Sequence, residues 1–417
     1  MKSKMLLSAA LSAAVLSASI FSLAGCSGST NTVNLMDGID VDCPAPPLEE
    51  EYMDSVDGLN FALELLKNSA EGKENLTLSP ASAMIALSMT SNGAKGKTQD
   101  EMVGLMGSDC TQDIINGYWE AYPDSRFNED EHSVRIANSI WINKSSAFTP
   151  NEDFLKTNAY YYNAGVFSTP FDDTTVKDMN EWISENTDGE IDEMVKEIDP
   201  SCVMSLINTV LFDSQWEKEF DHNHTYESEF HNADGTKSNV MMMSSDGERY
   251  IWGDNVKGFV KDYKNNYQFA ALLPEEDTDI NDFISSLDSG TVDSILESVD
   301  ENETAHIVVP EYENSCSLSL VDPLKAMGMN TAFDSEKADF SALGSSENGN
   351  LYIGSIMQNC TIKVNELGTK ASAATKIDVF EGAAMIENEV ILNRPFIYMI
   401  IDSNTHMPLF IGVQYSM

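Results

Sequence analysis

Hydrophobic residues recur at helical and strand spacings over most of the chain after residue 54. Leu59, Leu63 and Leu66 stand three or four apart, which predicts a helix; a second helix is predicted from Pro80 and a third from Thr98. Further helices are predicted over 151–164 and 178–186, and strands over 203–212, 239–243, 259–273, 305–309, 396–401 and 409–415. The two kinds of element mix without a regular βαβ rhythm, so residues 54–417 are expected to form an α+β body.

The N-terminal residues have a different pattern, which is typical of an export signal. Lys2 and Lys4 precede an apolar run over 5–23, and the sequence Leu23-Ala24-Gly25-Cys26 resembles a bacterial lipobox. We therefore expect a signal peptide at 1–25, lipidation of Cys26 and a lipid-anchored flexible tether over 26–53. The secreted protein would be held at the outer face of the bacterial cell membrane or at the cell surface. An ordinary signal peptide with a nearby cysteine is the alternative.

Composition excludes several kinds of partner and site. The 417 residues include 24 Lys and Arg against 68 Asp and Glu, which gives a formal net charge of −44. Such a surface repels the phosphates of nucleic acids, so no nucleic-acid partner is expected. The five cysteines other than Cys26 are scattered, odd in number and form no CxxC pair. They predict neither a disulfide framework nor a zinc site, and most are expected to be small buried hydrophobic residues.

Motifs that suggest chemistry fall short of a catalytic or cofactor site. Residues 93–98 resemble a phosphate-binding loop, but the glycine spacing is too short and the motif follows a helix. His222, His224 and His231 could bind a metal from one side of a strand, yet no carboxylate follows at a diagnostic interval. The chain has no G-x-S-x-G nucleophile turn. We therefore expect no enzyme activity, no metal and no cofactor.

The segment over 368–385 is unusually rich in small residues. Read as a strand, it has one uncharged face, made of Thr369, Ala371, Ala373 and Thr375. The other face carries most of the polar groups, so the pattern predicts a strand that is buried on one side. Gly368 could serve as a pivot before it. An ordinary alanine-rich loop or strand remains the alternative on this segment alone.

Many short motifs, in order along the body, resemble the serpins, the serine-protease-inhibitor family. Residues 364–369, followed by 371–375, resemble the hinge of that family. The other matches are 75–80 with Ser82; 93–94 with Thr98 and Glu101; 180–182 with Thr187, Gly189 and Ile191; 206–208 with Phe212, Trp216 and Phe220; Phe333 and 338–341; 393–396; and 409–412. The resemblance implies the serpin fold, with three β-sheets, about nine helices and an exposed reactive-centre loop.

The family also implies a mechanism and names the residues that would carry it. A protease attacks the loop as a substrate, and the cut loop then inserts into the central sheet and traps the acyl-enzyme. By this resemblance, Glu366 and Gly368 belong to the hinge, and insertion begins at Thr369. Lys370 stands where the family usually has glutamate, Leu367 replaces a residue that is commonly polar, and Gln358 replaces a histidine that many members have beneath the central sheet. A glutamine can still form hydrogen bonds at that position.

The expected reactive bond lies within the window Gly382, Ala383, Ala384 and Met385, because the two ends of the loop give slightly different counts. No basic residue lies between Lys376 and Arg394. A trypsin-like protease is therefore not expected, since its buried acid would stay unpaired. We expect a monomer that inhibits elastase-like or subtilisin-like serine proteases. A non-inhibitory serpin-fold binding protein is the alternative, and a solute-binding lipoprotein of another fold has no support beyond the lipobox.

Overall fold

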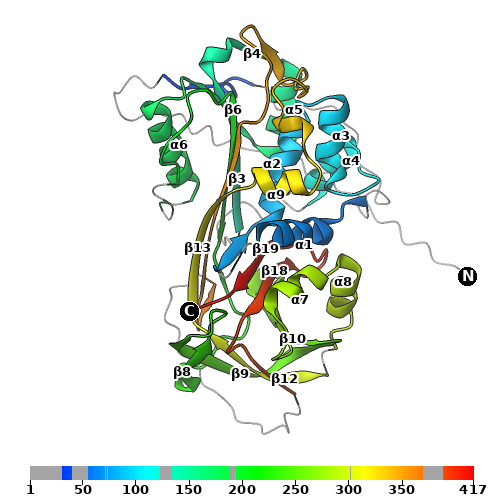
Figure 1. Cartoon of the computed structure of the whole chain (residues 1–417), viewed down its shortest axis with the longest axis vertical. Coiled ribbons are helices and arrows are strands. Elements are labelled where there is room, and N and C mark those ends of the chain that lie inside the picture. Colours follow the sequence, from blue (N-terminus) through cyan, green and yellow to red (C-terminus); the bar gives the residue numbers. More distant parts are fainter. Residues whose placement is uncertain are drawn as a thin grey trace, which may run out of the picture. The chain divides into compact units, whose positions relative to one another are not determined.

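The computed structural model describes residues 31–39, 55–122, 134–187, 194–369 and 388–417, without positions 71, 73 and 301 but with Gly189 and Ile191 in addition. In these residues the chain forms nine α-helices and three β-sheets (Figure 1). The predicted α+β architecture, with about nine helices and three sheets, is confirmed.

The first sheet, sheet A, contains the segment that the sequence identified as a hinge. Its strands follow the order β1-β5-β3-β6-β15-β16-β7, and β13 also pairs with β15. Their bounds are β1 Val33–Asn34, β5 Gly165–Thr169, β3 Val134–Asn143, β6 Met204–Phe212, β15 Ser355–Val364, β16 Gly368–Thr369, β7 Ser214–Gln215 and β13 Tyr312–Ser319. Strands β6 and β15 pair in parallel from Ser205/Ser355 to Val210/Cys360, and we call this pairing the seam.

The second sheet contributes a cluster of buried aromatic residues to the core, among them Phe259, Phe269 and Tyr398. Its order is β17-β12-β9-β10-β11-β18-β19-β2, with β8 paired to β9. The bounds are β17 Asn388–Ile391, β12 Thr304–Pro310, β9 Lys237–Gly253, β10 Val256–Asp262, β11 Tyr267–Pro274, β18 Phe396–Asp402, β19 Pro408–Gln414, β2 Leu76–Leu78 and β8 Thr225–His231. Strands β18 and β19 are buried at every position. A third, two-stranded sheet joins β14 Gly344–Ser346 to β4 Phe148–Pro150.

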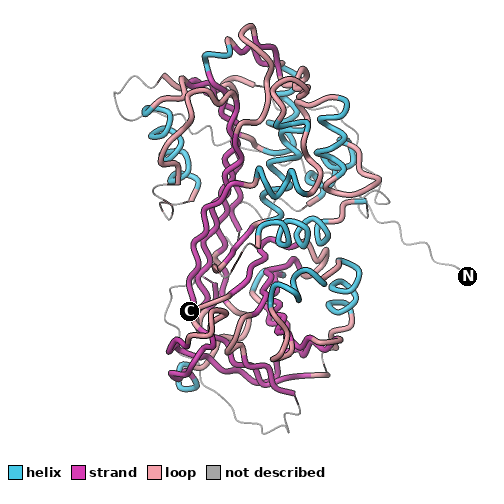
Figure 2. Tube along the Cα trace, in the orientation of Figure 1, coloured by secondary structure: helices cyan, strands magenta, loops and turns pink. Residues whose placement is uncertain are grey.

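Helices lie on both sides of sheet A, and α7 and α8 lie beside the second sheet (Figure 1). Their bounds are α1 Gly58–Ser69, α2 Pro80–Ser91, α3 Gly96–Gly104, α4 Gln112–Ala121, α5 Glu152–Tyr162, α6 Asp173–Asn186, α7 Ile280–Ser286, α8 Ser289–Glu297 and α9 Val321–Ala326. In Figures 1 and 2, α6 lies on one side of the long strands and α2 to α5 lie on the other. All twelve residues of α2 are buried, so this helix sits inside the core rather than at the surface.

Several sequence-based boundaries need correction. The strand predicted over 259–273 is two strands, β10 and β11, because Asn265 and Asn266 adopt positive φ and turn the chain between them. The tether prediction does not hold for 31–39, since Val33 and Asn34 pair with β5; the rest of the predicted tether lies outside the described residues. His222–His224 form a 3₁₀ turn and not a strand.

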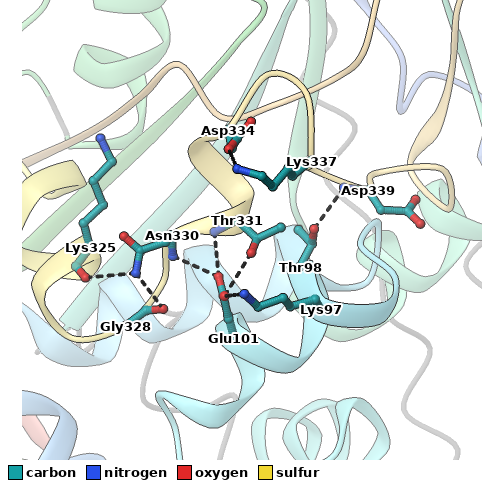
Figure 3. Close-up of polar contacts among 10 residues, drawn as sticks. All are labelled: Lys97, Thr98, Glu101, Lys325, Gly328, Asn330, Thr331, Asp334, Lys337 and Asp339. Atoms are coloured by element: carbon teal, nitrogen blue, oxygen red, sulfur yellow. Dashed lines mark hydrogen bonds and ion pairs between the residues drawn. The ribbon is translucent and has the colours of Figure 1, made fainter.

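The loop that resembled a phosphate-binding site has a structural role (Figure 3). Lys97 lies 3.2 Å from the carboxylate of Glu101, and Thr98 accepts a hydrogen bond from the Asp339 amide at 2.9 Å. Glu101 also accepts bonds from the amides of Asn330 and Thr331, at 2.9 and 2.6 Å. Burial alone would raise the pKa of Glu101, but these hydrogen bonds together hold it below its usual range. The motif therefore ties α3 to the segment over 330–339.

Candidate functional site: the hinge at the end of the seam

The hinge strand β16 is already seated in sheet A, between β15 and β7. Thr369 pairs antiparallel with Val364 of β15 and with Ser214 of β7, and Gly368 pairs with Gln215. A Cβ at Gly368 would lie 2.1 Å from the Ser214 carbonyl oxygen, so no larger residue fits at this point. Close approach to β7 therefore explains this glycine, in addition to the pivot role predicted from the sequence.

Thr369 is fully buried and is held by its side chain as well as by its backbone. Its hydroxyl is hydrogen-bonded to the hydroxyl of Tyr263, which follows β10. Burial raises the pKa of Tyr263 far above its usual range, so the phenol stays neutral. The Tyr263 ring stacks on Trp216, with centroids 4.1 Å apart and planes 13° apart. These buried, neutral surroundings favour an uncharged residue at 369.

Two aromatic residues hold the backbone that leads into β16. Trp216 donates its amide to Leu367 O and its indole N–H to Asn365 O, both at 2.9 Å. Phe220 donates its amide to Glu366 O at 3.0 Å. Three consecutive carbonyls are therefore fixed by these two residues, which leaves little freedom in the turn before the hinge strand.

The Glu366 side chain points to a polar cluster at the surface. It accepts hydrogen bonds from the Thr225 hydroxyl and from His222 Nδ1, the latter at 2.9 and 3.0 Å to its two oxygens. The hydrogen bond and the charge of Glu366 raise the pKa of His222. Burial, and then the charge of Glu366, raise the pKa of the neighbouring Glu311. The cluster is electrostatically coupled to the hinge.

A buried polar ladder crosses the seam beneath the hinge. Gln358 of β15 lies opposite Asn208 of β6, and its Nε2 donates to Asn208 Oδ1 at 2.9 Å. The same amide group donates to Ser79 O at 2.9 Å and accepts from Ser79 N at 3.0 Å, at the start of α2. The expectation that a glutamine at 358 would still form hydrogen bonds is confirmed. The ladder pins the two seam strands to each other and to the helix behind them.

The structure brings together only part of the predicted site. Glu366, Gly368 and Thr369 meet at the end of sheet A where β15 finishes, with Trp216 and Phe220 from the predicted family motifs. Tyr263 and Lys261 complete this region and were not identified from the sequence. Ala371, Ala373, Thr375, the window Gly382 to Met385 and Cys26 lie outside the described residues. Among the residues that are described, no group of three or more His, Cys, Asp or Glu side chains could hold a metal, and no helix is long and apolar enough to cross a membrane.

Comparison with known proteins identifies the family. Residues 58–416 match the family model described as Serpin (serine protease inhibitor). The chain belongs to the serpin family. Similar curated serpins include alpha-1-antiproteinase S of Cavia porcellus, 28% identical over 81% of this chain and 84% of that protein, and Serpin B8 of Homo sapiens, 27% identical over 84% and 96%. Serpins are generally inhibitors of serine proteases and not catalysts.

Solved serpin structures agree with the fold. The thermophilic serpin tengpin in its native state is 38% identical, with a TM-score of 0.87 over 93% of this chain and 100% of that chain. Tengpin in its latent state is 36% identical, with a lower TM-score of 0.76 over 89% and 99%. Human thyroxine-binding globulin in complex with its hormone is 25% identical, with a TM-score of 0.78 over 87% and 98%. The chain is therefore more similar to tengpin in its native state than to tengpin in its latent state.

Proposed function

We propose that this serpin is inhibitory and traps serine proteases as a suicide substrate, by inserting its cleaved loop into the seam. The observation that carries the proposal is the position of Thr369. It is buried between β15 and β7 and paired to Val364 and Ser214, which lie four residues beyond the last seam pair, Cys360 and Val210. This position supports the proposal, because a strand continued from Thr369 would run between β15 and β6.

The register of β16 supports the predicted inserting face. Continued in the same pairing with β15, the strand would bring Ala371, Ala373 and Thr375 opposite three core-facing residues, which are Ile362, Cys360 and Gln358. Continued from β7 into β6, it would bring the same three residues opposite Phe212, Val210 and Asn208. All six partners are at most 1% exposed. Small uncharged side chains fit such positions, whereas an unpaired charge would cost several kcal/mol.

The geometry also indicates why insertion would be favourable. The seam strands are parallel to each other and β16 is antiparallel to β15, so an inserted strand replaces one parallel pairing with two antiparallel ones. At about 1 kcal/mol net for each added hydrogen bond, a dozen residues would release on the order of 10 kcal/mol. That free energy is comparable to the whole stability of a typical domain.

In the proposed reaction, this free energy drives the last step, which is the insertion of the cleaved loop. The serine oxygen of the protease attacks the reactive carbonyl, the peptide bond breaks, and the amine leaves with the C-terminal part of the loop. The acyl group remains on the protease as an ester. Insertion then moves the tethered protease before water can attack that ester.

The target class rests on the window Gly382, Ala383, Ala384 and Met385. Each candidate residue is small or modestly apolar, and none is basic. An elastase-like or subtilisin-like protease with a small apolar pocket accepts such a residue, whereas a pocket built around a buried acid does not. Sequencing the peptide released on complex formation identifies the bond.

Mixing residues 27–417, which lack the signal peptide and Cys26 but keep β1, with pancreatic elastase, followed by a denaturing gel, tests the function. A covalent complex at the summed mass is expected, together with a C-terminal peptide. Cleavage without complex and without a rise in melting temperature would instead identify a non-inhibitory serpin-fold binding protein. Thyroxine-binding globulin, a structural neighbour, was solved with thyroxine bound, so a binding role has to be considered as well. The melting temperature after cleavage therefore serves as a separate readout for a non-inhibitory protein.

We also propose that Cys26 carries a lipid that holds the protein at the outer face of the cell membrane. The proposal rests on the lipobox-like residues 23–26 after an apolar run. Cys26→Ser is expected to move the protein from the membrane fraction to the medium and to abolish incorporation of labelled palmitate. Retention in the membrane fraction without label would leave an uncleaved signal as the anchor.

A further inference from the structure

Lys261 is the one buried lysine or arginine among the described residues, and it lies directly behind the hinge. It stands on β10 and is 1% exposed. Its ammonium donates to Glu248 Oε1 at 2.7 Å, and the same oxygen accepts a bond from the Ser245 hydroxyl at 2.8 Å. Burying a charged pair costs free energy that an apolar residue of similar size would not, so its position calls for a reason beyond filling space.

The ammonium faces the two aromatic rings that organise the hinge. Lys261 Nζ lies 4.6 Å from the centroid of the Phe220 ring and 5.5 Å from that of Trp216. The two rings meet edge to face, with centroids 6.0 Å apart. A cation at these distances is attracted to the ring faces, and the attraction is strongest where water is excluded. The rings are therefore held toward β10 by a charge that solvent does not screen.

The same two residues donate the hydrogen bonds that fix the hinge backbone. Trp216 binds the carbonyls of Asn365 and Leu367, and Phe220 binds that of Glu366. Trp216 also stacks on Tyr263, whose hydroxyl binds Thr369. A shift of either ring would therefore move the turn that feeds Thr369 into sheet A.

We propose that Lys261 is a positioning residue for loop insertion: its ammonium, held by Glu248, orders Trp216 and Phe220 so that Thr369 stays aligned between β15 and β7. The inference rests on the proposed inhibitory function and deepens it. Lys261 touches neither the protease nor the reactive bond. It acts on the competition between insertion, which traps the protease, and hydrolysis, which releases it.

Three variants separate positioning from a purely structural role. Lys261→Met removes the cation, Lys261→Arg keeps it, and the double variant Glu248→Gln with Lys261→Met leaves no unpaired buried charge. Lys237→Met is the matched control, because it breaks an exposed 2.7 Å pair with Glu229 in the same sheet. The two readouts are the urea midpoint of unfolding and the number of inhibitor molecules cleaved per covalent complex formed with elastase.

We expect Lys261→Met and the double variant to raise the number of inhibitor molecules cleaved per covalent complex about tenfold. This size is consistent with a desolvated cation between two rings. Lys261→Arg and Lys237→Met should stay within about twofold of the wild type. A double variant with both the wild-type urea midpoint and the wild-type ratio overturns the inference. If the double variant does not fold, Lys261→Arg decides: a ratio about tenfold above the wild type overturns the inference, and a wild-type ratio supports it.

A wild-type protein that forms no complex would refute the proposed function, and insertion must then be followed directly. The loop is cut with a broad-specificity cysteine protease, and the rise in melting temperature is timed. The wild type and Lys261→Arg should gain stability about tenfold faster than Lys261→Met. Equal rates, or no rise in any variant, overturn the inference.

Discussion

Replacing Thr369 by arginine tests the insertion mechanism at its first residue. Thr369 is fully buried, its hydroxyl is bonded to Tyr263, and its backbone pairs on both sides. Losing the side-chain bond costs about 1 kcal/mol. Burying an unpaired guanidinium in the same place costs about 3 kcal/mol or more. The arginine is therefore expected to swing out of the sheet and to return only at this cost.

The consequence for inhibition follows from the competition between two rates. A barrier raised by about 3 kcal/mol slows insertion by more than about 100-fold, while hydrolysis of the acyl-enzyme is unchanged. Thr369→Arg should therefore be cleaved by elastase at the wild-type bond but form almost no complex. The assay is a denaturing gel across a range of inhibitor-to-protease ratios, with the released peptide identified by mass.

A matched control makes the same threonine-to-arginine substitution at a position of sheet A that is less buried. Thr361→Arg places the same substitution on β15, where the residue is half-buried and its hydroxyl bonds to the exposed Ser315. It should inhibit at the wild-type ratio. If Thr369→Arg also inhibits at that ratio, the claim that insertion starts at this buried position is wrong.

Three further substitutions probe the seam, the glycine and the surface cluster. Gln358→Leu leaves buried polar groups at the start of α2 unpaired and should cost about 3 kcal/mol in urea unfolding, with Gln358→His recovering part of it. Gly368→Ala places a Cβ 2.1 Å from Ser214 O and should increase the number of inhibitor molecules cleaved per covalent complex. An unchanged number contradicts this. The hydrogen bond and charge of Glu366 raise the pKa of His222, so their pairing stabilises the fold fully below the ordinary histidine pKa of about 6.5 and is lost as pH rises through the raised pKa. The melting-temperature advantage over His222→Gln should therefore be largest in acid and shrink as the pH is raised.

Strands that are apolar along most of their length could be predicted from the sequence. A strand with a polar residue on its buried face could not. Strands β18 and β19 are continuous apolar runs, and both were predicted to within two residues at each end. Strand β15 also alternates between buried and half-buried positions, but Gln358 occupies a buried one. Its side chain is satisfied by α2 and β6, which are distant in the sequence, so no local pattern marks the strand.

The hinge shows the same limit for the functional site. The small residues after Gly368 marked the segment, because few structures other than a strand with one buried face need that alternation. Tyr263, Lys261 and His222 carried no such mark, since their roles depend on tertiary contacts with Thr369, Trp216 and Glu366. The histidine cluster suggested a metal only when it was treated as a strand, and the 3₁₀ turn directs His222 to the hinge carboxylate instead.

The seam between β6 and β15 also limits how many protease molecules one copy of the protein could inhibit. Each of its strands presents a single row of backbone groups to the other, so one strand inserted between them would pair with both rows and leave none for a second. Under the proposed mechanism that strand comes from the molecule itself and, once seated, is too stable to leave. Each copy would be spent after one encounter with a protease. Protection would then be limited by how many fresh molecules the cell makes, and a binding constant would be the wrong measure of potency.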